Sequence, residues 1–190
     1  GGLKVAPFAA FDHQAGGQVG IDLLVENTTS YVPNNVQQNQ LNGVLGSLNL
    51  ASGQTVGLRF SFVYSGSSTP AALHKFDMSF YDFDTGNDGN NVETLSIADD
   101  QYARYTLSAD TTLAVGGEGG RTRFTATEPG GGSDNPADPL NLTYVQRRRV
   151  IQFSFEEASS FELTFEVGPG GGGRNFLFAG EGQVVETAAF

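Results

Sequence analysis

Apolar and polar residues alternate in several short segments of this chain. Between residues 58 and 64, an apolar or aromatic side chain occupies every second position: Leu58, Phe60, Phe62 and Tyr64. The same period of two recurs in residues 76–80, 151–155 and 161–165. Successive side chains of a strand point to opposite faces, so each segment is predicted to be a strand with one buried face. We expect the last two segments to form a hairpin.

Other segments rich in β-branched and aromatic residues add to the predicted strands. They comprise residues 20–26, 44–50, 92–98, 103–108, 121–127, 175–179 and 183–187. Residues 138–146 are expected to form a helical turn, because Asp138 resembles an N-cap followed by proline. About ten or eleven short strands, separated by glycine-rich reversals, predict an all-β fold, namely an antiparallel, jelly-roll-like β-sandwich.

The chain divides into an extended N-terminal segment, residues 1–17, and a single sandwich domain, residues 18–190. The N-terminal segment carries Val5, Phe8 and Phe11 and ends in the pair Gly16-Gly17, which provides a hinge. An apolar strand on a hinge fits strand addition, in which one protomer completes the sheet of another. The alternative is that the segment pairs within its own sandwich. The C-terminal residues Val184, Val185 and Phe190 form a second candidate for exchange.

Composition narrows the function classes. The chain has 190 residues, no cysteine and a formal net charge of -11. The lack of cysteine excludes disulfides, thiol catalysis and cysteine-bound metals. The negative charge argues against nucleic acid as a partner, because such binding needs a basic surface. No apolar run approaches the roughly 20 residues of a membrane span, so membrane insertion is not expected. The first residues lack the regions of a signal peptide, so export would make this the processed form.

The sequence predicts no enzyme, because its reactive residues do not form a recognised catalytic spacing. His13 and His74 are the only histidines, and neither belongs to a metal-binding motif. A glycosidase would need two converging carboxylates. The alternation instead places Glu156, Glu162 and Glu166 opposite the phenylalanine faces, on a solvated surface of the sheet.

One loop has the composition of a calcium site. Residues 82–93 follow a predicted strand directly and contain five oxygen donors that form the predicted metal site: Asp82, Asp84, Asp88, Asn90 and Glu93. Calcium takes six to eight oxygen ligands, and one loop can supply several of them. A second acidic loop, residues 133–139, is a candidate to complete the site. The alternative is a hairpin turn whose side chains bond to their own backbone.

Three further surface features follow from the sequence. Asn27 and Asn141 each begin an Asn-x-Thr sequon and are predicted N-glycosylation sites in accessible loops. The basic run 147–149 is expected to form ion pairs with neighbouring glutamates on an outer sheet face, with a binding patch as the alternative.

Three segments carry a resemblance to a known group: residues 80–86 (FYDFDTG), 134–150 (DNPADPLNLTYVQRRRV) and 172–180 (GGRNFLFAG). Together they resemble a β-sandwich domain of secreted surface proteins from algae and related protists, over about residues 55–180. The resemblance implies an extracellular or cell-surface location, N-glycosylation and assembly into surface fibrils. It implies no catalytic activity.

Two functions follow as expectations. The first is a structural subunit of an extracellular fibril or surface layer that assembles with itself by strand addition. The second is a lectin-like carbohydrate-binding module, with calcium as a candidate cofactor and surface glycans as partners. The second requires a groove with exposed aromatic rings, for which the candidates are Tyr31, Tyr81, Tyr102 and Tyr105.

Overall fold

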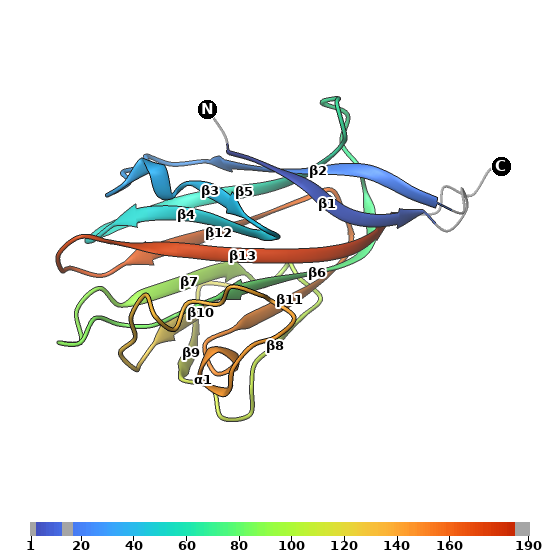
Figure 1. The fold of residues 1–190 in the computed structure, drawn as a ribbon. Coiled ribbons are helices and arrows are strands. Elements are labelled where there is room, and N and C mark those ends of the chain that lie inside the picture. Colours follow the sequence, from blue (N-terminus) through green and yellow to red (C-terminus); the bar gives the residue numbers. More distant parts are fainter. Residues whose placement is uncertain (1–2, 13–16, 185–190) are drawn as a thin grey trace.

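The protein is a two-layered β-sandwich (Figure 1). The computed structural model describes the backbone of residues 3–12 and 17–184, and the side chains of residues 20–180. The strands are β1 (Leu3–Asp12), β2 (Gly17–Asn27), β3 (Gln40–Asn42), β4 (Leu45–Ala51), β5 (Gln54–Tyr64), β6 (Leu73–Tyr81), β7 (Glu93–Ala98), β8 (Arg104–Thr106), β9 (Leu113–Glu118), β10 (Arg121–Ala126), β11 (Ile151–Ala158), β12 (Ser160–Val167) and β13 (Gly173–Val184). The helical elements in the described part of the chain are η1 (Val36–Gln38) and α1 (Tyr144–Arg147).

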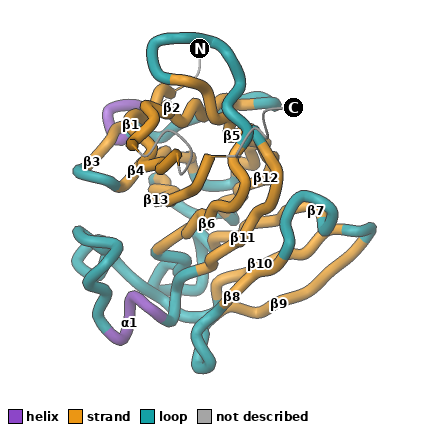
Figure 2. The backbone as a smooth tube through the Cα atoms, turned by 90° about the vertical axis from the view of Figure 1, so that its right-hand side faces the viewer, coloured by secondary structure: helices purple, strands orange, loops and turns teal. Residues whose placement is uncertain are grey.

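Two antiparallel sheets make up the sandwich (Figure 2). The first has the strand order β3-β4-β13-β6-β11-β8, and the second has the order β2-β5-β12-β7-β10-β9. In the sandwich, four strands of the first sheet, β4-β13-β6-β11, pack against four strands of the second sheet, β5-β12-β7-β10. These eight strands have the arrangement of a jelly roll, which consists of two Greek keys. The predicted fold class, an antiparallel jelly-roll-like β-sandwich, is therefore confirmed.

Strand β1 lies outside these eight strands and joins the two sheets. It pairs antiparallel with β2 of the second sheet, and residues 9–11 pair in parallel with residues 181–183 of β13 in the first sheet. The ladder with β2 shifts register between Val5 and Phe8. Pro7 lies within this irregularity, as expected for a residue that has no N–H to donate to a ladder. The donor-strand candidate thus pairs with its own chain in this structure.

A phenylalanine-rich core fills the space between the sheets. The rings of Phe60 and Phe161 stack with centroids 4.8 Å apart, and those of Phe80 and Phe176 stack at 5.2 Å. The phenylalanines with less than 2% of their surface exposed are Phe60, Phe62, Phe80, Phe83, Phe124, Phe153, Phe155, Phe161, Phe165, Phe176 and Phe178. The period-two segments predicted from the sequence supply most of them, so the predicted buried faces are confirmed except at Tyr64, which is 38% exposed.

The hairpin predicted for residues 151–165 is wrong. Strand β11 pairs with β6 and β8, whereas β12 pairs with β5 and β7, so the two strands belong to opposite sheets. Their apolar faces still meet, because the rings of Phe155 and Phe161 stack across the core with centroids 4.3 Å apart. The alternation determines which face is buried but not which sheet each strand joins. Glu157, at φ 51, lies where the chain turns from one sheet to the other.

Two other local predictions need correction. Residues 175–179 and the described part of 183–187 belong to one continuous strand, β13. The helical turn begins later than predicted, because Thr143 is its N-cap and forms a capping box with Gln146. Asp138 instead accepts a hydrogen bond from the Leu140 N–H at 2.9 Å, which closes a turn before the helix.

Candidate functional site

Residues 82–85 follow strand β6 and form hydrogen bonds with the loop of residues 127–134. Asp82 has φ 67, a left-handed conformation that Asp tolerates better than most residues do. The Thr85 N–H donates to the Glu128 carbonyl, and the Gly130 N–H donates to the Thr85 carbonyl, both at 3.0 Å. Phe83 is buried in the core, whereas Asp82 and Asp84 each direct a carboxylate oxygen to a common place near Asp134. Residues 127–134 are thereby held against them.

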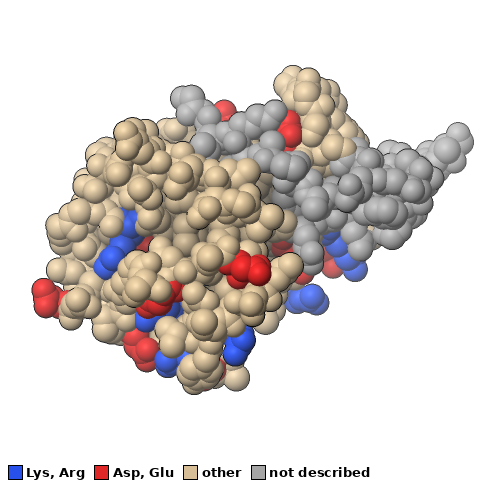
Figure 3. All heavy atoms as spheres, in the orientation of Figure 1, with Lys and Arg blue, Asp and Glu red and all other residues tan. Residues whose placement is uncertain are grey.

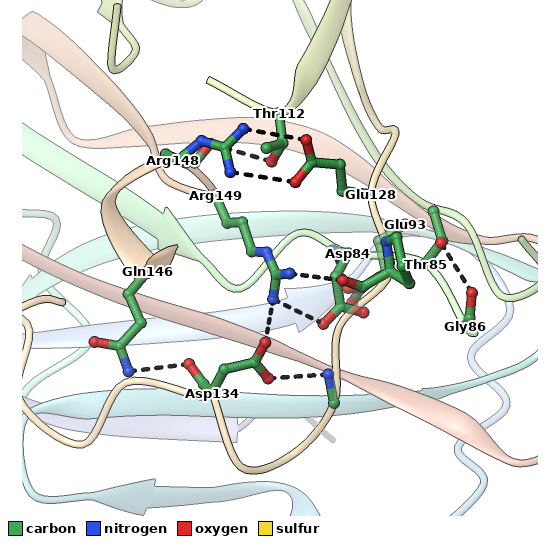
Figure 4. Close-up of polar contacts among 12 residues, drawn as sticks. Asp84, Thr85, Gly86, Glu93, Thr112, Glu128, Asp134, Gln146, Arg148 and Arg149 are labelled. Carbon is green, nitrogen blue, oxygen red and sulfur yellow. Dashed lines mark hydrogen bonds and ion pairs between the residues drawn. The ribbon is translucent and has the colours of Figure 1, made fainter. Parts of the chain in front are cut away.

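Three carboxylates converge at this place. One oxygen each from Asp82, Asp84 and Asp134 lies within 4.8 Å of the other two, so the three side chains could hold a metal ion. Arg149 extends between Asp84 and Asp134 (Figure 4): it hydrogen-bonds to Asp134 and donates to the Pro129 carbonyl at 2.7 Å. We name Asp82, Asp84 and Asp134 the acidic triad.

The arginines near the acidic triad leave part of it without hydrogen bonds. Arg149 Nη1 lies 3.5 Å from Asp84 Oδ2, and Arg174 Nη2 lies 3.7 Å from Asp84 Oδ1. Asp84 Oδ1 and Arg174 Nε are both buried and have no hydrogen-bond partner in the described structure. A buried polar atom without a partner is uncommon in folded proteins and calls for an explanation.

Burial sets the protonation of the carboxyl groups. It raises the pKa of Asp82 to about 8, with smaller contributions from the charges of Asp84 and Asp134. Burial also raises the pKa of Asp84 to about 6, although Arg174 and Arg149 oppose the rise. The pKa of Glu93 is raised well above its usual value, again chiefly by burial. Removing a carboxylate from water disfavours its charged form, and this effect is the main cause of all three raised pKa values.

The predicted metal site overlaps the acidic triad only in part. Asp82 and Asp84 belong to it, and Asp134 joins them from the second acidic loop. Glu93 lies beside Asp84, where its Oε2 accepts a hydrogen bond from the Asp84 N–H at 3.0 Å. Asp88 is exposed at the tip of the loop, and Asn90 packs over Gly86. Residues 86–90 form a turn through backbone hydrogen bonds, whereas the alternative interpretation expected side chains to bond to the backbone.

The basic run 147–149 does not form a single outer-face ladder. Arg148 follows the prediction in part, since it pairs with Glu128 at 3.1 Å and lies 3.8 Å from Asp110. Arg149 is only 5% exposed and points to the acidic triad, so its predicted place on the surface is wrong. Figure 4 shows the two side chains extending in different directions. On the face drawn in Figure 3, acidic and basic side chains are interspersed.

The glutamates considered for catalysis lie on the outside of the sheets. Glu156 pairs with Lys75, Glu162 with Arg59 and Glu166 with Arg123. Of the two histidines, His74 is exposed and contacts Glu157, and His13 lies outside the described residues. The outer-face prediction for the three glutamates is confirmed.

Both predicted glycosylation sites are exposed. Asn27 ends β2 and its side-chain amide donates to the Thr29 carbonyl at 2.8 Å, while Asn141 lies in the loop before α1. Glycosylation at these sites stays a prediction, because exposure is necessary for a glycan but does not prove one.

The four candidate tyrosines differ in exposure, from the buried Tyr81 to Tyr105, which is 40% exposed. Tyr81 is 6% exposed, and the hydroxyl of Tyr31 is held by Asn39 and Asn49. Tyr102 is half-buried, and the Tyr105 ring packs edge-on against Phe124. An open groove of about 570 Å³ does lie over β7, β9 and β10, but its lining contains no aromatic residue: Ser96, Ala114, Val115, Gly116, Gly117, Glu118, Arg121, Arg123 and Thr125.

The predicted assembly residues Val5, Phe8 and Phe11 belong to β1, whose backbone is described, but their side chains lie outside the described residues. Of the second candidate segment, Val184 ends β13, and Val185 and Phe190 lie outside the described residues.

Comparison with known proteins gives a fold likeness. No protein-family model matches the chain, and no curated protein matches it. Among solved structures, the chain is similar to the N-terminal domain of the Streptococcus gordonii adhesin Sgo0707, with a TM-score of 0.50 and 12% sequence identity. The chain shares its fold with an adhesin domain. The match covers 90% of this chain and 44% of the adhesin chain, so the likeness concerns less than half of that structure.

The described residues include no helix that is long and apolar enough to cross a membrane.

Proposed function

We propose that this chain is a non-catalytic β-sandwich module of an extracellular or cell-surface protein, and that copies assemble by exchanging strand β1. The observation that carries the proposal is the position of β1. It pairs with β2 and with three residues of β13, and it is not one of the eight jelly-roll strands. The fold likeness to an adhesin domain supports a role at the surface.

Exchange of β1 would preserve its pairings. If β1 of one copy occupies the same position in a neighbour, each hydrogen bond to β2 and β13 is replaced by an equivalent bond between chains. Residues 13–16 connect β1 to β2 in the sequence. A head-to-tail exchange that does not close into a ring produces a filament.

Single-cysteine variants test the exchange directly, because the chain has no native cysteine. Ala9 of β1 and Glu181 of β13 are register partners. We expect a mixture of Ala9→Cys and Glu181→Cys chains to form a disulfide-linked heterodimer after unfolding, joint refolding and oxidation. A mixture of Ala9→Cys with Val44→Cys gives the background from random collisions, since Val44 is 67% exposed and lies outside β1.

Size and shape provide the second measurement. The unmodified chain should form filaments or oligomers in electron microscopy and light scattering, and Phe8→Asp with Phe11→Asp should abolish them while the thermal transition remains. Val44→Asp serves as the control for an added surface charge. Heterodimer yield at the background level, or assembly that persists in the double variant, would overturn the exchange of β1.

A further inference from the structure

Four carboxyl groups and two guanidinium groups meet at the end of β6. The carboxyl groups are those of the acidic triad and of Glu93, and the guanidinium groups are those of Arg149 and Arg174. If every group is ionised, two negative charges remain uncompensated in a buried place. Buried charges are costly unless they are paired or coordinate a metal. The imbalance equals the charge of one divalent cation.

The hydrogen bonds are distributed unevenly among the triad. Asp134 has partners on both oxygens, because Oδ1 accepts from the Gly131 N–H at 2.9 Å and Oδ2 accepts from Arg149. Asp84 Oδ1, on a side chain only 4% exposed, accepts no hydrogen bond. Asp82 is 9% exposed, and its carboxyl group receives no hydrogen bond from the described residues. Two carboxyl groups of the triad therefore carry oxygens that accept no hydrogen bond from the described residues.

The spacing of the oxygens fits a cation. Calcium binds oxygen at about 2.3–2.6 Å, so two ligands on opposite sides of the ion lie about 4.6–5.2 Å apart. The three oxygens of the acidic triad all lie within 4.8 Å of one another. Magnesium usually keeps several of its waters, whereas calcium accepts larger and more flexible shells of protein oxygens. A partly buried set of carboxylates from two loops favours calcium.

We propose that Asp82, Asp84 and Asp134 bind one calcium ion. The ion would use the unpartnered oxygens of Asp82 and Asp84 and would link the segment after β6 to the loop that contains Asp134. Arg149 then positions Asp134, and Arg174 offsets the remaining charge. This site is independent of strand exchange, because none of its residues lies in β1.

Calorimetric titration of the chelator-treated full chain with calcium chloride tests the proposal. We expect one binding event per chain, with weaker binding of magnesium. At a calcium concentration one hundred times Kd, the melting temperature should rise by about 5–10 °C, as expected for a domain of this size. A folded chain that shows neither binding heat nor a thermal shift at about 10 mM calcium would overturn the proposal.

Asp82→Asn is the sharpest variant, because the Asp82 carboxyl group has no hydrogen bond to the described residues that the change could remove. It should fold without calcium at least as stably as the unmodified chain and should weaken calcium binding at least tenfold. Asp88→Asn is the matched control, since Asp88 is acidic and exposed in the same loop. An unchanged calcium response in Asp82→Asn, or its loss in Asp88→Asn, would show that the acidic triad is not the site.

Discussion

A methyl group built on Gly130 would lie 2.0 Å from Asp84 Oδ2. The same methyl group would lie 2.3 Å from Arg149 Nη1, so the glycine forms one wall of the acidic triad. We expect Gly130→Ala to displace these side chains, to destabilise the fold by about 1–3 kcal/mol and to abolish the calcium response. Urea unfolding measures the loss of stability, and the thermal shift on adding calcium measures the calcium response. Gly131→Ala is the matched control, because a methyl group added there would meet nothing within 4 Å. Equal effects of the two variants would contradict the prediction.

Stability without calcium should fall as pH rises. The pKa of Asp82 is raised from 3.8 to about 8 and that of Asp84 to about 6, chiefly by burial. Between pH values of about 4 and 8 the folded state therefore holds protons that the unfolded state has released, and the free energy of unfolding declines through this window. The measurement is the melting temperature in chelator at several pH values from about 5 to 9.

The control for this pH effect is Asp82→Asn, which carries no titrating group at that position. Its melting temperature should decline less than that of the unmodified chain between pH values of about 6 and 8, and the comparison separates the triad from repulsion over the whole acidic surface. Identical pH profiles for the two proteins would refute the assignment to Asp82.

Glycans are expected on both exposed sequons when the chain passes through a eukaryotic secretory pathway. Intact-mass measurement before and after glycosidase treatment should show a mass loss, and Asn27→Gln with Asn141→Gln should remove it. Asn87 is exposed but has no sequon, so Asn87→Gln should leave the mass loss unchanged. A mass that glycosidase does not alter would count against both sites.

The stacked phenylalanine core should dominate stability. Phe60 is fully buried and contacts the rings of Phe80, Phe161 and Phe178. We expect Phe60→Ala to lower the free energy of unfolding by about 3–5 kcal/mol, because it removes apolar contacts and leaves a cavity. Val36, which is 64% exposed, provides a control in which Val36→Ala changes the value by less than about 0.5 kcal/mol. Similar unfolding midpoints for the two variants would refute a central role for Phe60.

The sequence predicts local features of this fold better than pairings between distant segments. Alternation identified the buried face of β5 through Phe60 and Phe62, because a period of two is a property of the strand itself. It could not assign β11 and β12 to different sheets, because both arrangements bury the same phenylalanines. Likewise, the loop after β6 suggested a cation site at once, but its apparent ligands included Asp88, which points to solvent.

The site residues that the sequence does not predict come from segments distant from the loop after β6. Asp134 was expected only as an addition from another loop, and Arg149 looked like one member of a surface run. No sequence pattern marks Arg174 as a site residue, since it follows a run of glycines at the start of β13. Arg149, just before β11, and Arg174, in β13, meet Asp84 because β11 and β13 both lie beside β6 in one sheet.

The parallel pairing of the first and last strands has a mechanical consequence. Strand β1 runs in the same direction as β13, and its residues 9–11 lie beside residues 181–183. A pulling force applied through Leu3 and Val184 would therefore slide the two strands along each other. In that geometry the hydrogen bonds between residues 9–11 and 181–183 carry the load together, whereas a peeling force would break them one after another. The parallel pairing of β1 and β13 thus places these hydrogen bonds in shear when the chain is pulled from Leu3 and Val184.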